Sequence, residues 1–209
     1  MRVLVATRSG HKLREIRTIL REVPELELLS PEELGIPPSP EEEGIEAFST
    51  FEENARAKAR WFHIRSGGFP TLADDSGLEV DALEGRPGVH SKRFAPEQAE
   101  LTGQELDEAN NLHLLHLLGD LPLAERTGRY VCVAVLHRGP GEEVVVRGEA
   151  EGLLLGRPRG WEGFGYDPLF LDPRLGLTFA EITPSEKDAR SHRGKAFREL
   201  ATHLLQATG

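Results

Sequence analysis

The sequence predicts an α/β fold, and three parts of the chain carry that prediction. Residues 2–6 form an apolar, strand-like run, and residues 13–20 then repeat leucine and isoleucine at helical spacing. Residues 71–73 predict another short strand that leads into polar residues. Residues 129–137 have the period of a strand, and a Gly-Pro-Gly turn takes them into residues 144–147 as a β-hairpin. Strands interspersed with helices in this way are typical of a sheet covered by helices.

Composition and charge exclude several classes of protein. The chain has 209 residues, enough for one domain or for two lobes that share a core. Its formal net charge of −10 argues against nonspecific binding to nucleic acid or to anionic membranes. The single Cys132 excludes an intramolecular disulfide and suits a reducing compartment. Because no apolar run has membrane-spanning length and residues 3–6 are too short for a signal peptide, a cytoplasmic location is expected.

The turn after the first strand has the chemistry of an anion site. Residues 7–12 read Thr-Arg-Ser-Gly-His-Lys and join that strand to the helix. Free backbone N–H groups and the helix dipole favour a phosphate at such a helix start, and Lys12 adds a full positive charge. The spacing is not that of a Walker loop. A helix N-cap followed by a solvated lysine is the alternative interpretation.

Two adjacent carboxylates, Asp74 and Asp75, follow the strand at residues 71–73, and Ser76 and Gly77 come next. Adjacent like charges repel each other, so stability explains the pair poorly, whereas α/β enzymes place their chemistry where strands end. Aspartate, serine and glycine also favour turns, and a plain turn is the alternative.

The helix expected at residues 48–65 carries a second candidate lysine. Its apolar positions form one face, and Asn54 and Lys58 lie outside that face. Lys58 follows Asn54 by one turn on a helix that leads into the acidic pair, which makes it a candidate for contact with phosphate. The preceding residues 36–44 contain three prolines and three consecutive glutamates. We expect a loop there, either solvated or with one carboxylate at a metal.

Two further stretches have unusual chemistry. Residues 160–168 are rich in glycine and aromatic side chains, a composition that lets backbone approach a flat ligand while a ring stacks on it. A tight turn with its rings in the core is the alternative. Near the C-terminus, His192 and Arg193 open a helix, although cations are unfavourable in a first turn. That mild local cost indicates a functional reason for them.

Six motifs occur in order along nearly the whole chain. They are Ala6-Thr7 with Lys12; Thr50-Phe51-Glu52-Glu53-Asn54-Ala55 with Lys58-Ala59; Ala73-Asp74-Asp75-Ser76-Gly77-Leu78; Gly88 with Ser91 and Arg93-Phe94; Gly163-Phe164-Gly165-Tyr166-Asp167-Pro168; and Ala180-Glu181 with Glu186-Lys187 and Ser191-His192-Arg193. Each motif alone is weak, but the six together closely resemble the inosine triphosphatase family of house-cleaning pyrophosphatases.

The resemblance implies both a fold and a reaction. The implied fold is an elongated α/β domain of residues 1–209, with a long, twisted, mixed sheet flanked by helices, two lobes and a central active-site cleft. The implied protein is a homodimer that needs Mg²⁺ and binds neither nucleic acid nor membrane. It would hydrolyse ITP, dITP and XTP, which are noncanonical purine nucleoside triphosphates, to the monophosphate and pyrophosphate, and so remove them from the nucleotide pool.

The resemblance also implies roles for particular residues. Asp75 would be the general base and a metal ligand, with Lys12 and Lys58 as the other catalytic residues. Glu41 would be the second metal carboxylate, with Glu42 as the near alternative. The implied substrate-binding residues are Thr7, Arg8, Ser9, Gly10, His11 and Lys12 around the triphosphate, Ser76 beside the nucleotide, and Phe164, Gly165, Tyr166, Asp167, Lys187, His192 and Arg193 around the purine.

The turn at residues 7–12 departs from the family pattern. Many members have Thr-Gly-Asn where this chain has Thr7-Arg8-Ser9. Arginine does not adopt a positive φ as cheaply as glycine, and serine has no side-chain amide. The geometry of the turn therefore does not follow from the resemblance, although Gly10 is available for a flexible role.

Two rival functions fit the same residues. One is a pyrophosphatase that acts on pyrimidine or modified nucleotides, and the other is a noncatalytic nucleotide-binding module. The acidic pair favours catalysis, because additional carboxylates would weaken the simple binding of an anion.

Overall fold

The computed structural model describes residues 1–96 and 100–206, with side chains up to residue 204. The strands are β1 (Arg2–Val5), β2 (Glu27–Leu29), β3 (Thr71–Val80), β4 (Thr127–Gly139), β5 (Glu142–Leu154), β6 (Phe170–Asp172) and β7 (Leu177–Thr178). The helices are α1 (Gly10–Leu20), α2 (Phe51–Arg65), α3 (Gly103–Leu118), α4 (Pro184–Arg190) and α5 (His192–Gln206). Short 3₁₀ turns occur at Pro40–Gly44, Asp81–Leu83, Gly88–Arg93 and Leu123–Glu125.

The strands form one open, mixed sheet of seven strands in the order β2-β1-β3-β4-β5-β6-β7. Strand β1 pairs in parallel with β2 and β3, whereas β6 pairs antiparallel with β5 and β7. The predicted α/β class and mixed sheet are confirmed. The elongated shape and the cleft stay predictions.

The chain folds into two compact units. The first comprises Met1–Asp75, Cys132–Gly148 and His192–Gly209, and the second comprises Ser76–Val131 and Glu149–Ser191. Strands β3, β4 and β5 each contribute residues to both units. The description of residues 1–209 as a single domain stays a prediction.

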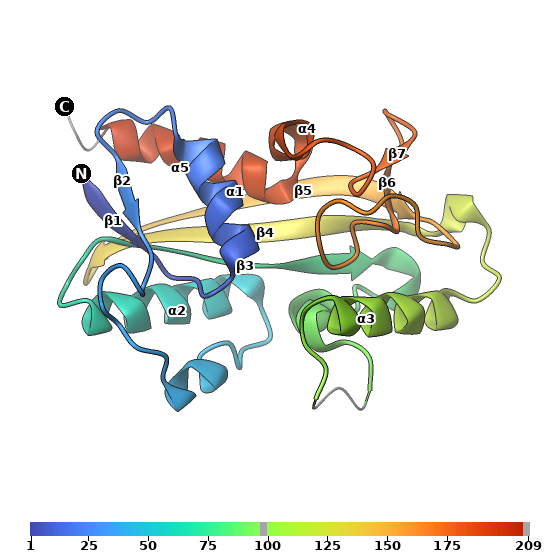
Figure 1. Cartoon of the computed structure of the whole chain (residues 1–209), viewed down its shortest axis with the longest axis horizontal. Coiled ribbons are helices and arrows are strands. Elements are labelled where there is room, and N and C mark those ends of the chain that lie inside the picture. The colour runs from blue at the N-terminus through green and yellow to red at the C-terminus, as the bar shows by residue number, and fades with distance from the viewer. Residues whose placement is uncertain (97–99, 207–209) are drawn as a thin grey trace. The chain divides into compact units, whose positions relative to one another are not determined.

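In the first unit, helices cover both faces of the parallel strands (Figure 1). Helices α1 and α5 lie on one face, where Ile16 and Phe197 share a buried core with Val3, Val5 and Leu72 of the strands. Helix α2 lies on the other face and buries the apolar stripe that the sequence predicted. A Cβ atom on Gly148 would come within 2.6 Å of the Ala196 backbone nitrogen, so α5 meets β5 at a distance that only glycine permits.

The second unit has a core of its own. Leu114 and Leu118 of α3 pack with apolar residues of β3, including Leu78 and Val80. Aromatic rings complete this core: the ring centroids of Tyr130 and Phe170 lie 4.6 Å apart, and those of Phe170 and Phe179 lie 4.9 Å apart. Glycine-rich and polar connections surround these elements, in keeping with the exposed position of most loops.

The structure corrects the expected end of the strand at residues 71–73. Strand β3 continues to Val80, so Asp74, Asp75 and Ser76 lie inside the strand rather than after it. Aspartate is depleted in strands because its charge is costly to bury without partners. Here the partners come from distant parts of the chain, and the sequence of the strand does not reveal them.

Other differences are local. Helix α2 begins at Phe51, because the Thr50 side chain caps it by accepting a hydrogen bond from the backbone of Glu53. Ser191, which directly precedes α5, is the C-cap of α4. None of the helices within the described residues is both long and apolar enough to span a membrane.

Candidate active site

The turn at residues 7–12 has the predicted strand–cap–helix arrangement. Ser9 is the N-cap of α1, and its hydroxyl accepts a hydrogen bond from the backbone N–H of Lys12 at 3.3 Å. The hydroxyl of Thr7 accepts one from the N–H of Ser9 at 3.1 Å. The turn therefore ends at the positive end of a helix dipole, and Lys12 lies in the first helical turn. We refer to residues 7–12 as the phosphate loop, after the role that the sequence predicts for them.

Asp74 is a buried carboxylate held by cations. Only 1% of its surface is exposed, and its Oδ2 lies 3.1 Å from Lys12 Nζ and 3.1 Å from Arg193 Nη2. Burial alone would raise the pKa of Asp74, but Lys12, Arg193 and Lys58 hold that pKa well below its usual range. Asp74 is therefore a permanent negative charge in the first unit.

For Asp75, the neighbouring residue, the pKa is shifted in the opposite direction. Burial raises the pKa of Asp75 above its usual value, Lys58 and Lys12 oppose the shift, and Glu46 adds to it. Asn54 donates a hydrogen bond to Asp75 Oδ2 at 3.0 Å and so orients the carboxylate. A buried, oriented carboxylate with a raised pKa has the properties of a general base.

Lys58 pairs with a third carboxylate, that of Glu46. Its ammonium forms an ion pair with Glu46, and its side chain is mostly buried. Burial would lower the pKa of Lys58, but Glu46, Asp74 and Asp75 raise it above its usual value. We refer to Asp74, Asp75, Glu46, Lys58 and Lys12 as the acidic–lysine cluster.

Glu41 and Glu42 have other partners. The Glu41 carboxylate pairs with Arg65, and its side chain is 64% exposed. Arg65 lies seven residues beyond Lys58 on α2, which is about 10 Å along the helix axis. Glu42 caps the 3₁₀ turn and accepts two hydrogen bonds from Arg8. The carboxylate that joins the acidic–lysine cluster is Glu46, four residues before the N-cap of α2, and the role of Glu41 or Glu42 as a metal ligand stays a prediction.

Arg193 lies among carboxylates of the first unit, and its expected contact with a purine stays a prediction. It is 1% exposed, and its guanidinium donates to Asp74 through Nε and Nη2 and to Glu15 of α1 through Nη1. A buried guanidinium needs carboxylate partners to offset its desolvation, and these two carboxylates supply them. Arg193 therefore joins α1, β3 and α5 within the first unit. Its neighbour His192 is also buried.

In the second unit, the glycine-rich aromatic loop is held from within. The Tyr166 ring is buried, and its hydroxyl donates to the backbone oxygen of Ser91 at 2.8 Å. The Asp167 carboxylate accepts from the Phe164 N–H at 2.9 Å and from Lys187 Nζ at 2.6 Å. For Tyr166, the alternative of a ring tucked into the core is the one observed.

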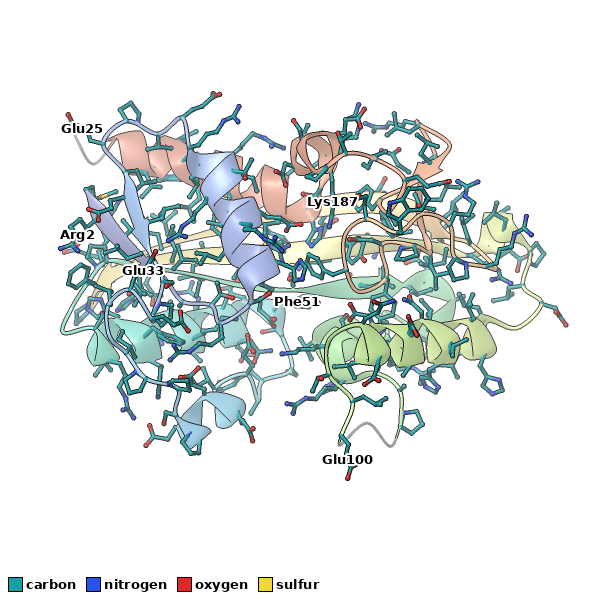
Figure 2. All side chains as sticks on the ribbon, in the orientation of Figure 1. Arg2, Glu25, Glu33, Phe51, Glu100 and Lys187 are labelled. Atoms are coloured by element: carbon teal, nitrogen blue, oxygen red, sulfur yellow. The ribbon has the colours of Figure 1, made fainter. Side chains whose placement is uncertain are left out.

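Phe164 is the more accessible part of the loop region, and it contacts Lys187, which is buried. Lys187 Nζ, on α4, lies 4.6 Å from the centroid of the Phe164 ring, within the range of a cation–π contact (Lys187 is labelled in Figure 2). Phe164 and Gly165 are half-buried, and Gly165 adopts a φ of +62°. Ser76 is half-buried in β3. These residues remain candidates for contact with a substrate.

Sequence reasoning missed three residues of the site in the first unit. Asn54 seemed to face solvent, yet it is 1% exposed, and its amide also accepts from the Phe48 N–H at 2.9 Å. The signal available was its position one turn before Lys58. The only sequence feature that could have indicated Glu46 was its distance from Thr50, and no sequence feature indicated Glu15. Among the described residues, no three histidine, cysteine or acidic side chains form a ready-made metal cluster.

Comparison with known proteins identifies the family. The sequence model of the Ham1 family matches residues 3–203. The chain belongs to the Ham1 family. Among curated relatives in that family, the dITP/XTP pyrophosphatase of Frankia alni is 48% identical over 99% of this chain and 98% of its own length. That of Geobacter sulfurreducens is 46% identical over 97% of this chain and 96% of its own length.

Solved Ham1 structures have the same fold. A HAM1 protein from Coxiella burnetii superposes with a TM-score of 0.84 at 35% identity, covering 99% of both chains. The Staphylococcus aureus Ham1 protein superposes with a TM-score of 0.82 at 33% identity, covering 99% of this chain and all of its own. The resemblance drawn from the six motifs is therefore confirmed at the level of family and fold.

Proposed function

We propose that this protein hydrolyses noncanonical purine nucleoside triphosphates, namely ITP, dITP and XTP, to the monophosphate and pyrophosphate. Its relatives in the Ham1 family are named dITP/XTP pyrophosphatases and match it over almost the full chain. The observation that carries the proposal is the acidic–lysine cluster, in which Asp75 has a raised pKa beside two lysines. A general base and two cations are what the attack of water on a phosphoanhydride requires.

In the proposed reaction, Asp75 accepts a proton from the attacking water. The water oxygen bonds to phosphorus, the α–β phosphoanhydride bond breaks, and pyrophosphate leaves with the electron pair of that bond. Asn54 keeps the Asp75 carboxylate in one orientation through its hydrogen bond. The phosphate loop offers backbone N–H groups at the start of α1, while Lys12 and Lys58 balance the negative charge of the triphosphate.

The acidic–lysine cluster also has the donors that Mg²⁺ prefers. The carboxylates of Asp75 and Glu46 offer hard oxygen ligands. Within the described structure, Asp74 Oδ1 is buried without a hydrogen-bond partner, which leaves one more oxygen for a cation. We assign the metal to Asp75 and Glu46, in place of the Glu41 expected from the sequence. Bound Mg²⁺ would neutralise charge on the phosphate chain and orient the water.

We assign the purine to the aromatic loop of the second unit and the residues near it. The Phe164 ring offers a stacking face, and Lys187 together with backbone N–H groups offers hydrogen-bond donors. Gly165 supplies backbone that approaches closely. Tyr166 and Asp167 shape the loop from inside.

Removing either lysine of the acidic–lysine cluster should impair turnover strongly. We expect Lys12→Ala and Lys58→Ala each to lower kcat/KM for ITP by ~10²-fold or more, because each removes a positive charge positioned for the transition state. Arg60→Ala is the matched control, since Arg60 is an exposed cation on α2 that pairs with Glu143. Steady-state kinetics of the three variants check this. A lysine whose loss costs no more than the loss of Arg60 would be only a structural residue.

The products identify the reaction and separate it from its two rivals. Purified protein with Mg²⁺ and a panel of nucleoside triphosphates should release pyrophosphate, not orthophosphate, from ITP, dITP and XTP. Release mainly from pyrimidine or modified nucleotides would favour the first rival. Binding of nucleotides without release of either product would favour the noncatalytic module.

The oligomeric state and the location of the protein are also proposals. We propose that the protein is a homodimer in the cytoplasm, as the family resemblance implies. Sedimentation equilibrium of the purified chain tests the first point, because a monomer at micromolar concentration would contradict it.

A further inference from the structure

Arg8 is one of the two residues at which the phosphate loop departs from its family, and its side chain has a defined place. A guanidinium has five N–H donors, and all five are engaged here. Nε donates to Glu42 Oε2 at 3.1 Å, and Nη1 donates to Glu32 Oε1 at 2.8 Å and to the Ile36 oxygen at 3.0 Å. Nη2 donates to the Pro37 oxygen at 3.0 Å and to Glu42 Oε1 at 2.8 Å. No N–H of the Arg8 side chain is left for a phosphate.

One further contact holds the guanidinium. Its central carbon lies 5.6 Å from the centroid of the Phe62 ring on α2, within reach of a cation–π interaction. The hydrogen bond to Glu42 raises the pKa of Arg8 further above its already high value, although burial acts in the opposite direction. The pairing with Glu42 is bidentate, a geometry that lysine cannot reproduce.

The hydrogen-bond partners of Arg8 all belong to the segment of residues 31–45, between β2 and α2. Glu42 lies at the centre of this contact, because its Oε1 also accepts from the Ser39 N–H at 3.1 Å and closes the cap of the 3₁₀ turn. Arg8 thus binds a turn whose first residues are capped by hydrogen bonds between Ser39 and Glu42. The residue after this segment is Glu46, which pairs with Lys58 in the acidic–lysine cluster.

We propose that Arg8 is a positioning residue that fastens segment 31–45 to the phosphate loop and so holds Glu46 at Lys58. Its side chain is not a ligand of the triphosphate, and the backbone of the loop keeps that role. The fastening is a property of the protein alone. Only the effect of this contact on catalysis rests on the proposed function. The contact itself and its effect on catalysis are therefore tested separately.

Hydrogen exchange of the protein alone tests the fastening. Arg8→Ala should speed amide exchange in peptides covering residues 36–46 by about tenfold or more, because the contacts that close this segment are lost. Arg8→Lys should behave almost like Arg8→Ala, since lysine keeps the charge but lacks the planar guanidinium that binds Glu42 in a bidentate manner. Unchanged exchange in residues 36–46 of Arg8→Ala would overturn the proposal.

Arg17→Ala is the matched control. Arg17, on α1, binds the same connection through Glu33 Oε2 at 2.6 Å and the Leu28 oxygen at 3.0 Å, but its partners lie before the 3₁₀ turn (Glu33 is labelled in Figure 2). We expect Arg17→Ala to leave exchange in residues 36–46 within about twofold of the unaltered protein. If both variants loosen residues 36–46 equally, Arg8 has no special role, and the proposal fails.

Kinetics then test the consequence for catalysis. We expect Arg8→Ala to lower kcat for ITP by about tenfold and to raise the Mg²⁺ concentration that gives half-maximal activity, while KM for ITP stays within about twofold. Glu42→Gln should reproduce this pattern, and the double variant should be no worse than the worse single variant. A rise in KM of tenfold with unchanged exchange would make Arg8 a phosphate ligand. If no nucleotide is hydrolysed at all, the proposed function fails while the exchange result still decides the fastening.

Discussion

Asp75→Asn should lower kcat for ITP by ~10² to 10⁴-fold and leave the fold intact. Asparagine has nearly the shape of aspartate, but it neither accepts the proton of the attacking water nor contributes charge to a bound cation. Its amide still offers an oxygen to the hydrogen bond from Asn54, so the strand should keep its local geometry. Kinetics at saturating Mg²⁺ measure the loss, and near-normal activity would remove Asp75 from the role of base.

The pKa of Asp75 supplies an independent check on the same variant. Because that pKa is raised in the folded protein, the folded state keeps the proton to a higher pH than the unfolded chain does. This contribution to stability is present at low pH and is lost as the pH rises through the folded pKa. At neutral pH the charged Asp75 therefore costs stability, and Asp75→Asn should have an equal or higher Tm. A large fall in Tm would mean that the loss of activity came from misfolding.

Arg193→Met should have the largest effect on stability. Arg193 joins Asp74 and Glu15, and its removal leaves two carboxylates without their buried cation. Breaking a buried ion pair in this way typically costs about 3–5 kcal/mol. Urea unfolding at neutral pH measures the loss. Lys195→Met is the matched control, because Lys195 is an exposed cation on the same helix and its loss should cost no more than about 0.5 kcal/mol.

The stability lost in Arg193→Met should depend on pH. The pKa of Asp74 is depressed in the folded protein, so Asp74 contributes stability above its unfolded pKa and loses that contribution as the pH falls through its folded pKa. Removing Arg193 weakens this depression, and the gap between variant and unaltered protein should narrow as the pH is lowered. A variant of normal stability that has lost only its preference for ITP would return Arg193 to the purine site implied by the resemblance.

Local patterns in the sequence predicted much of the fold. The strand, turn and helix of residues 2–20 follow from short-range signals, namely an apolar run, a capping serine and helical spacing of apolar residues. The β-hairpin of β4 and β5 follows from its period and its Gly-Pro-Gly turn. Each of these signals lies within the element that it describes.

The contacts that decide the site are long-range, and the sequence could not show them. Arg193 and Asp74 are 119 residues apart in the chain, and nothing near either one indicates the other as its partner. The strand therefore seemed to end at the acidic pair, whereas these distant cations let it continue. The ion pair of Glu41 with Arg65 could not be foreseen for a similar reason, since the two residues lie in different elements and the turn capped by Ser39 and Glu42 intervenes near Glu41.

The choice among nucleotide bases tests the central claim most directly. ITP and XTP carry a carbonyl at the purine 6-position, where ATP carries an amino group, and each buried donor left facing that amine costs about 1–3 kcal/mol. Several such donors together give up to roughly 10⁴-fold discrimination. The measurement is kcat/KM of the unaltered protein with Mg²⁺ for each nucleotide. We predict ITP, dITP and XTP well above GTP, with ATP and the pyrimidine nucleotides lowest, and hydrolysis of ATP as efficient as that of ITP would contradict the account.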